Sequence, residues 1–175
     1  SGGEPLLYLD FLIELGKLLK KENINYVIDT SGATFSMDDN YLKKFDELLS
    51  LADLFLLDLK ALDPTLHKTI TGKDNKNIIE CYEYLSAKNF PIWIRYVLVP
   101  GYTDGEETLK KSSNFLKKFK NIQRLEVLPY HALAIPKYSE LHLEYKLKDV
   151  KTPTKEEVER ANELIDSKYF DGYLK

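Results

Sequence analysis

Cysteine is scarce in this sequence, because Cys81 is the one cysteine among 175 residues. A single thiol excludes an intrachain disulfide, and it excludes a zinc site or an iron–sulfur cluster held by several thiolates of this chain. Long apolar runs are also lacking, since no segment approaches the ~20 consecutive apolar residues that span a bilayer. No basic segment precedes an apolar one at the start, as a secretory signal would require. We therefore expect no membrane partner and a cytoplasmic location.

A strong excess of one sign of charge is absent as well. The 25 basic and 28 acidic residues give a formal net charge of −3, so we expect no nucleic-acid partner. Five lysines that crowd one segment are interpreted as a solvated helix face: Lys110, Lys111, Lys117, Lys118 and Lys120. Hydrophobic residues make up 43% and charged residues 30%, the balance of a globular protein, and the length fits a single domain over residues 1–175.

The sequence does contain a regular alternation of strand and helix patterns. Four segments rich in aliphatic and aromatic residues predict strands at 24–30, 53–60, 91–99 and 122–131. Apolar residues at three- and four-residue spacing predict helices, the first over 6–22. Such an alternation builds βαβ units, so we expect an α/β fold with parallel strands. Four strands are too few for an eight-stranded barrel, which takes ~250 residues, so we expect an open, partial TIM-like barrel.

Four helix starts are predicted from side chains that can accept hydrogen bonds from the first backbone N–H groups of a helix. They are the capping-box pairs Ser36 with Asp39, Thr103 with Glu106 and Thr154 with Glu157, and Asp63 before Pro64. These positions fix where we expect the connecting helices to begin.

Polar side chains stand at or near the carboxyl ends of the predicted strands, where parallel sheets bind ligands. They are Asp29 and Thr30, Asp58 and Lys60, Arg95, and Tyr130 with His131. Residues two apart in a strand share a face, so Asp58 and Lys60 face away from Leu57 and its apolar neighbours. The apolar face is expected to pack on helices, and the charged residues are expected to face the concave interior, where unpaired charges are costly.

Structural roles remain open alternatives for these residues. Asp58 could simply pair with Lys60 in a satisfied buried network without catalysis. Arg95 could pair with Glu126 in the same way. For His131 alone, a hydrogen-bonded structural histidine is the expected role. Three other residues of reactive types are assigned structural places: His67 and His142 at the surface, and Cys81 in the core.

Six motifs follow one another along the chain: SGGEP, DTSG, LDLK, WIRYVLVPGYTD, LPYH and YKLKDVKTPTKEE. Their order and approximate spacing resemble the radical S-adenosylmethionine (SAM) enzymes, and within these the glycyl-radical-enzyme activases typified by the activating enzyme of pyruvate formate-lyase. Each motif alone is weak, but six in order are highly specific. The resemblance covers the whole chain and implies a partial (β/α)6 TIM-like barrel whose first two strands are missing.

The resemblance implies a site for SAM. The residues that it assigns to the cofactor are Gly2, Gly3, Glu4, Asp29, Asp58, Lys60, Arg95 and His131. The glycine loop with Glu4 is similar to the element that binds the amino group of SAM, and Lys60 offers a point charge for a carboxylate. A monovalent cation is assigned to Asp29, Thr30 and Asp58, because neighbouring carboxylates need a cation between them.

One departure from the family pattern is decisive. The activases carry a CxxxCxxC motif whose thiolates hold a [4Fe-4S] cluster, and this chain lacks it. The resemblance therefore implies the C-terminal portion of an activase, with the cluster in the full-length parent only and no catalytic residue in this chain. The parent would cleave SAM reductively, with electrons from a flavodoxin-type donor, and form a glycyl radical on a partner such as pyruvate formate-lyase. We expect the isolated chain to be inactive.

Two other functions stay open at this point. The chain could be a non-catalytic half of a split activase that binds SAM or a partner protein, or a Schiff-base lyase with Lys60 as the nucleophile. With the first two strands missing, the strand at 24–30 would have an unpaired edge beside exposed apolar residues. We therefore expect a homodimer joined through this edge.

Overall fold

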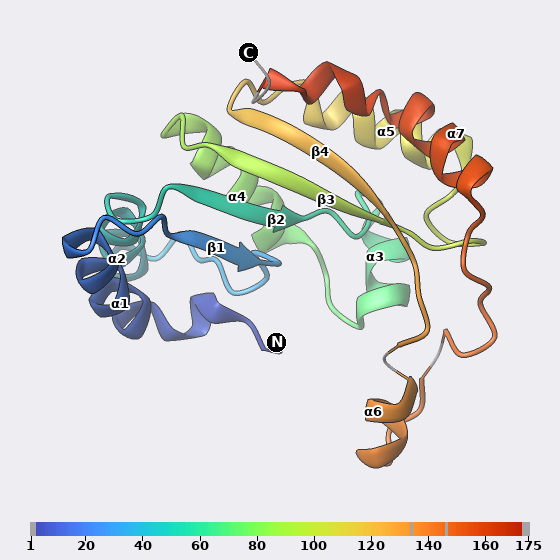
Figure 1. Cartoon of the computed structure of the whole chain (residues 1–175), viewed down its shortest axis with the longest axis horizontal. Coiled ribbons are helices and arrows are strands. Elements are labelled where there is room, and N and C mark those ends of the chain that lie inside the picture. The colour runs from blue at the N-terminus through green and yellow to red at the C-terminus, as the bar shows by residue number, and fades with distance from the viewer. Residues whose placement is uncertain (1–2, 134, 146, 173–175) are drawn as a thin grey trace.

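The computed structural model describes residues 3–133, 135–145 and 147–172. Within them, a single sheet has the strand order β1-β2-β3-β4. The strands are β1 (Val27–Thr30), β2 (Leu54–Asp58), β3 (Ile92–Leu98) and β4 (Ile122–Pro129). All neighbouring strands are parallel (Figure 1), so the predicted α/β fold with parallel strands is confirmed.

Helices connect the strands, and most of them lie against one face of the sheet. They are η1 (Pro5–Tyr8), α1 (Leu9–Lys21), α2 (Asp39–Leu49), α3 (Pro64–Thr71), α4 (Lys76–Ala87), α5 (Glu106–Leu116), α6 (Ile135–Glu140), α7 (Lys155–Ile165) and η2 (Ser167–Phe170). Figure 1 shows α1 and α2 beside β1, α4 behind the sheet, α5 and α7 beside β4, and α6 on a projecting arm. Within the described part of the chain, no helix combines the length and apolar character needed to cross a bilayer.

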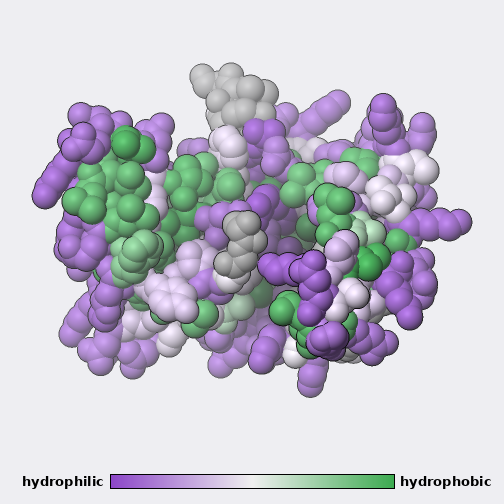
Figure 2. All heavy atoms as spheres, turned by 60° about the horizontal axis from the view of Figure 1, so that its bottom comes forward, coloured by the Kyte–Doolittle hydropathy of each residue, from purple (hydrophilic) through white to green (hydrophobic). Residues whose placement is uncertain are grey.

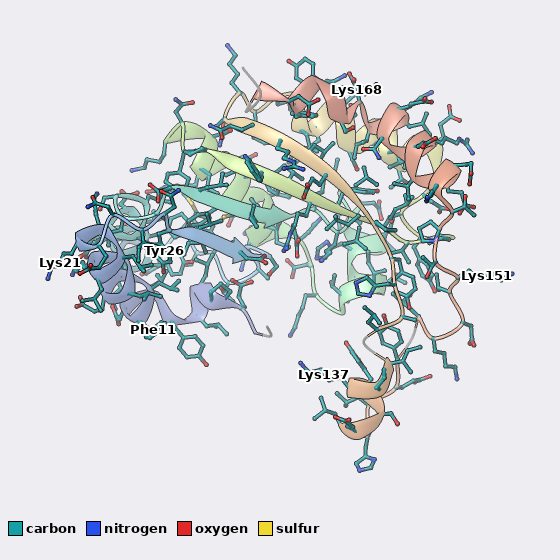
Figure 3. All side chains as sticks on the ribbon, in the orientation of Figure 1. Phe11, Lys21, Tyr26, Lys137, Lys151 and Lys168 are labelled. Atoms are coloured by element: carbon teal, nitrogen blue, oxygen red, sulfur yellow. The ribbon has the colours of Figure 1, made fainter. Side chains whose placement is uncertain are left out.

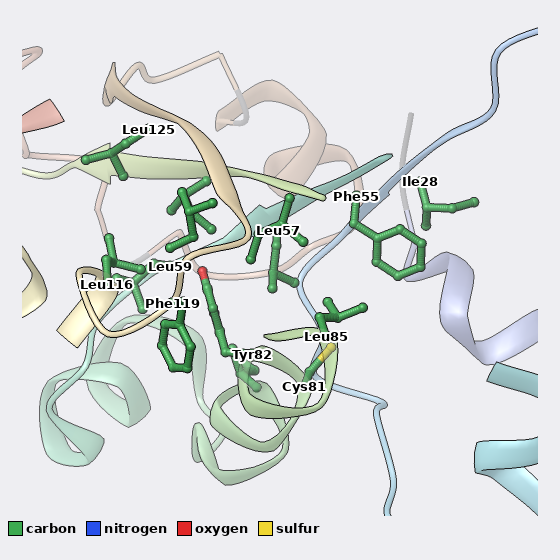
Figure 4. Packing of buried hydrophobic residues seen from close by; sticks show 14 of the residues in the cluster. Ile28, Phe55, Leu57, Leu59, Cys81, Tyr82, Leu85, Leu116, Phe119 and Leu125 are labelled. Carbon is green, nitrogen blue, oxygen red and sulfur yellow. The ribbon is translucent and has the colours of Figure 1, made fainter. Parts of the chain in front are cut away.

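The side chains of β2 and β3 alternate between the two faces of the sheet, as predicted. Those on the helix-facing side are fully buried: Phe55, Leu57, Leu59, Ile92, Ile94 and Tyr96. Those on the other side are only partly buried: Leu54, Leu56, Asp58, Arg95 and Val97. Helix α4 packs Tyr82 and Cys81 into the core (Figure 4), which confirms the predicted core cysteine. Burial raises the pKa of the Cys81 thiol.

Two of the four predicted helix starts are confirmed. The Asp63 carboxylate accepts a hydrogen bond from the backbone N–H of Leu66 at 2.8 Å, which begins α3. Thr154 and Glu157 form a reciprocal capping box at the start of α7. In both cases the side chain replaces a hydrogen-bond partner that the first helical turn lacks.

The other two predicted starts are wrong. Asp38, not Ser36, caps α2, because its carboxylate accepts two backbone N–H groups of that helix. Helix α5 follows Gly105 without a side-chain cap. The hydroxyl of Thr103 is instead buried in the turn after β3, where it accepts the N–H of Val99 at 2.7 Å and donates to a β3 carbonyl at 2.8 Å.

Two carboxylates shape the chain before β2. Glu4 caps η1 through a backbone N–H at 3.1 Å, so the predicted helix 6–22 is divided into η1 and α1. The predicted strand 24–30 begins later, because Asp53 holds Tyr26 outside the ladder. Its carboxylate accepts the Tyr26 N–H at 2.7 Å, and its own N–H donates to the Tyr26 carbonyl at 2.8 Å.

Candidate functional site

A cavity of about 740 Å³ opens at the carboxyl ends of β1 and β2, beside the middle of β3. Figure 2, which brings the lower side of Figure 1 forward, shows hydrophilic residues around a hollow in the middle of this face. Six predicted site residues line the cavity: Gly3, Glu4, Asp29, Thr30, Asp58 and Arg95. Tyr8 and Ser31 also line it, although no sequence motif singled out their side chains. Gly2, also predicted, lies outside the described residues.

Arg95, in the middle of β3, joins the ends of β1 and β2 through ion pairs. Its Nη1 lies 2.9 Å from Oδ2 of Asp29 on β1, and its Nη2 contacts the other oxygen of that carboxylate. Its Nε and Nη2 lie 3.1 and 3.0 Å from Oδ1 of Asp58 on β2. The second oxygen of Asp58 lies 2.9 Å from Nζ of Lys60. Because the Asp58 side chain is only 13% exposed, two cationic partners offset the cost of its burial.

The two ion pairs offered as structural alternatives have different outcomes. The pair of Asp58 with Lys60 is present, whereas the pair of Arg95 with Glu126 is wrong. Glu126 pairs with Arg124, two residues away on β4. Arg95 and Glu126 are opposite each other in the strand register, but the guanidinium turns to the two carboxylates on β1 and β2. A guanidinium has donors on three nitrogens, and two carboxylates can accept hydrogen bonds from more of them than one carboxylate can.

Glu4 fastens the glycine loop to the end of β1. Its Oε1 accepts the Thr30 hydroxyl and the Leu6 N–H, and its Oε2 accepts the N–H and hydroxyl of Ser31 at 3.0 and 2.5 Å. Gly3, one residue earlier, has φ of 94°, a backbone conformation that glycine adopts without steric cost. Protein donors thus engage both carboxylate oxygens, and the loop presents bare backbone beside the cavity.

Lys60 and His131 line a second cavity, of about 540 Å³. Most of its other lining is aliphatic or aromatic: Ile70, Val97, Val99, Leu128, Pro129, Tyr130, Tyr138, Tyr145 and Leu147. The ring centroids of Tyr138 and Tyr145 are 4.8 Å apart, and burial raises the pKa of Tyr145. His131 is exposed, and its expected role as a hydrogen-bonded structural histidine stays a prediction. The ion pair between Lys60 and Asp58 connects the two cavities.

A buried histidine supports the bend that carries Lys60, and the prediction of a surface position for His67 is wrong. His67 on α3 is 2% exposed, and its Nδ1 lies 3.2 Å from the Ala61 carbonyl oxygen. Asn75 donates from Nδ2 to the same carbonyl at 3.2 Å and to the Leu62 carbonyl at 2.8 Å. Because a carbonyl oxygen can only accept, Nδ1 is the donor in this contact, and burial lowers the pKa of His67. The sequence contained no signal for this arrangement beyond the polar residues themselves.

The residues of this chain do not fit an iron–sulfur cluster. Cys81 lies in the core on the helix-facing side of the sheet (Figure 4), whereas the first cavity is lined from the other side. In the described ranges, no three or more His, Cys, Asp or Glu side chains are grouped so as to hold a metal ion. The chemistry that the first cavity offers is therefore the binding of charged groups by carboxylates, a guanidinium and backbone.

Comparisons with known proteins agree with one another. The sequence model of the radical SAM superfamily matches residues 1–112 of this chain. The pyruvate formate-lyase-activating enzyme of Streptococcus mutans is 44% identical over all 175 residues, and that of Listeria monocytogenes is 40% identical over 167 residues, 95% of this chain. A crystal structure of a domain of pyruvate-formate lyase-activating enzyme from Bacteroides vulgatus superimposes with a TM-score of 0.77 at 25% identity, covering 97% of this chain and 92% of that chain.

The chain is shorter than these curated relatives. It spans 66% of the length of the Streptococcus mutans protein and 67% of that of the Listeria monocytogenes protein, about two thirds in each case. The matched domain of known structure, by contrast, is covered almost completely.

Proposed function

The chain belongs to the radical SAM superfamily, and on this premise we propose that it is the SAM-holding portion of an activating enzyme for a glycyl radical enzyme such as pyruvate formate-lyase. In the parent reaction, one electron cleaves SAM to methionine and a 5′-deoxyadenosyl radical, which removes a hydrogen atom from a backbone glycine of the partner. The observation that carries the proposal is that residues from four separate motifs line one cavity at the strand ends.

The two cavities support a ligand with a charged end and an aromatic end. In the first cavity, the Arg95 guanidinium suits a carboxylate, and the bare backbone near Gly3 suits an ammonium group. In the second cavity, aliphatic and tyrosine side chains suit an adenine ring. Lys60, paired with Asp58, lies where the two cavities adjoin, and His131 lines the second cavity. Glu4, whose oxygens are engaged, positions the loop.

The electron for cleavage must come from outside this chain. In the activases a [4Fe-4S] cluster supplies it, and the single buried thiol of Cys81 cannot replace three thiolates. We therefore expect anaerobic reconstitution with iron and sulfide to give neither stoichiometric cluster iron nor charge-transfer absorption. A chain that acquires both would contradict the proposal that the cluster belongs to the parent only.

Calorimetric titration with SAM tests the proposed site. Without an iron atom to bind the amino and carboxylate groups, we expect a dissociation constant no tighter than roughly millimolar. The double variant Asp58→Ala with Lys60→Ala should lose binding, while Lys111→Ala on exposed α5 should not change it. Micromolar affinity, or affinity that is unchanged in the double variant, would overturn the assignment.

The parent's partners and location are part of the same proposal. The names of the relatives identify pyruvate formate-lyase as the protein that those enzymes activate. We propose a glycyl radical enzyme of this kind as the partner, a flavodoxin-type protein as the electron donor, and the cytoplasm as the location. Co-purification of the full-length parent with its glycyl radical enzyme, lost when the partner's glycine loop is deleted, would test the first of these.

The exposed edge of the sheet supports a homodimer of the isolated chain. Among the described residues β1 pairs only with β2, and Ile24, Val27, Phe11 and Leu18 are exposed nearby. Figure 3 shows Phe11 projecting away from α1. We expect concentration-dependent association by analytical ultracentrifugation at ~100 μM, weakened by Val27→Glu and not by Leu143→Glu on the distant arm. A concentration-independent monomer would contradict it.

A Schiff-base lyase is the less supported alternative. Lys60 forms an ion pair with Asp58 at 2.9 Å, and a paired ammonium group lacks the free electron pair that attack on a carbonyl requires. Borohydride treatment with small carbonyl compounds should therefore leave Lys60 unmodified by mass spectrometry. Trapping of substrate carbon on Lys60 would favour the lyase instead.

A further inference from the structure

The residues assigned to a monovalent cation already have protein partners. Both oxygens of Asp29 accept hydrogen bonds from Arg95, and the oxygens of Asp58 are divided between Arg95 and Lys60. The Thr30 hydroxyl donates to Glu4 and accepts the backbone N–H of Gly32 at 3.0 Å. Each side-chain oxygen of the assigned triad is thus engaged by a donor from the protein. Arg95 and Lys60 also balance the two carboxylate charges, so the triad as folded has no net negative charge that would attract an added cation.

The charges of Asp29 and Asp58 explain why the Arg95 guanidinium lies beside both carboxylates. Two carboxylates at the ends of neighbouring strands repel each other, and the repulsion is strong where the groups are shielded from water. Shielding applies to Asp58 and Arg95, whose side chains are only 13% and 24% exposed, and less to Asp29, whose side chain is 52% exposed. A guanidinium between them supplies a permanent positive charge and a planar set of donors that matches carboxylate oxygens.

Covalent attachment gives Arg95 an advantage over an ion from solution. A free cation must be captured from bulk solvent and lose its own hydration, whereas the guanidinium is held beside the carboxylates by β3 at a high effective concentration. Asp58 on β2 is opposite Arg95 on β3, and Asp29 on β1 is opposite Leu56, two residues before Asp58 on the same face of β2. The Arg95 side chain therefore reaches both carboxylates along this face. The strand order therefore builds the contact into the fold.

We propose that Arg95 is the resident counter-ion of Asp29 and Asp58, and that a monovalent cation binds these carboxylates only when Arg95 leaves them. This inference goes beyond the proposed function, because it concerns the chain without SAM. It also changes the role given to Arg95, from a residue that contacts only the cofactor to one that controls access to the carboxylate pair.

Cation uptake of the chain without SAM tests the proposal. Equilibrium dialysis against ⁸⁶Rb⁺, with tetramethylammonium chloride as the bulk salt, counts bound ions directly. We expect no stoichiometric Rb⁺ uptake by the natural sequence. For Arg95→Gln we expect about one ion per chain, because the two carboxylates have lost their guanidinium partner and attract a cation. The double variant Arg95→Gln with Asp58→Asn should lose the uptake. Lys111→Ala serves as the control for a lost exposed charge.

Thermal unfolding gives a second readout. For Arg95→Gln, KCl should raise the Tm above its value in tetramethylammonium chloride at equal ionic strength, by roughly 3 °C for a tenfold excess over the dissociation constant. The natural sequence should show equal Tm values in both salts. If Arg95→Gln folds in KCl alone, the proposal is supported. If it folds in neither salt, Arg95→Lys takes its place, because one ammonium group cannot engage both carboxylates as a guanidinium fork does.

Stoichiometric Rb⁺ uptake by the natural sequence would overturn the proposal, and so would a folded Arg95 variant that binds no ion. Neither result depends on SAM affinity. Failure of the SAM titration with the expected Rb⁺ pattern would contradict the proposed function alone, whereas normal SAM binding with Rb⁺ uptake by the natural sequence would contradict the counter-ion role alone.

Discussion

The two faces of β2 and β3 differ sharply although alternate residues of the same strands build both. On the helix-facing side, Phe55, Leu57 and Tyr96 are fully buried. On the other side, Asp58 and Arg95 are partly exposed and carry paired charges. Because the period of a strand is two, a change on one face leaves the neighbouring residue on the other face in place. The stability of this domain and its ligand chemistry are therefore separable by single substitutions.

The largest effect is expected on the buried face. Phe55 packs edge-on against Phe45 and Phe90, with ring centroids 5.8 and 5.2 Å apart. Phe55→Ala should lower the free energy of unfolding by about 3–5 kcal/mol, because the cavity that it leaves adds to the lost burial. Leu56→Ala, one residue along and half-buried on the open face, should cost about 1 kcal/mol. Similar losses in urea unfolding for the two variants would break the contrast between the faces.

A smaller effect sharpens the contrast within the core. The Tyr96 hydroxyl is buried and donates to the Thr103 carbonyl at 2.8 Å, and burial raises the pKa of Tyr96 to about 12. Tyr96→Phe should cost about 1–2 kcal/mol in urea unfolding, because a buried carbonyl loses its donor. The Tyr82 hydroxyl is also buried but has no partner among the described residues. Tyr82→Phe should be neutral or stabilising; an equal cost for both would show that Tyr82 has a partner.

The smallest effect concerns the bend after β2, where Leu59 faces the core and Lys60 faces the second cavity. Burial lowers the pKa of His67 below the ordinary value of 6.5, so the unfolded chain takes up a proton first as the pH falls. The contribution of His67 to stability is therefore complete above pH ~6.5 and declines below it. His67→Gln should flatten this part of the decline in urea midpoints measured from pH 7.5 to 5.

His142→Asn provides the matched control, because His142 is exposed and its φ of 54° is one that asparagine tolerates. This variant should keep the pH dependence of the natural sequence. If both variants flatten the decline equally, or if neither does, the pH dependence of stability does not come from the burial of His67.

Sequence patterns predicted the features that depend on neighbours in the chain. Strand parity placed Asp58 and Leu57 on opposite faces correctly, since alternation is a property of the strand itself. The partner of Arg95 was wrong, because a long side chain can reach either neighbouring strand and only the packed structure selects one. The burial of His67 was missed for a related reason. Helical spacing does not show that the Ala61 carbonyl, in the bend after β2, needs a hydrogen-bond donor from α3.

The site was predicted more completely as a set of residues than as an arrangement. Motif order brought together most residues of the first cavity, because parallel strands place their carboxyl ends at one edge. It could not show that Glu4 is engaged by Ser31 and Thr30, or that Lys60 and His131 belong to a separate cavity. Hydrogen-bond saturation and cavity boundaries depend on side-chain positions that motifs do not encode.

The one-sided pairing of β1 has a consequence for amide hydrogen exchange. Among the strands that the structure describes, β1 has β2 alone as a neighbour, so its alternate N–H groups point away from the sheet, whereas β3 lies between β2 and β4. Amides of β1 should therefore take up deuterium through local opening, and those of β3 only when the whole sheet opens. Asp29 and Arg95 thus connect an edge strand to a strand that is paired on both sides. The ion pair between Asp29 and Arg95 therefore joins a strand that opens locally to one that does not, and local opening of β1 limits the lifetime of this ion pair.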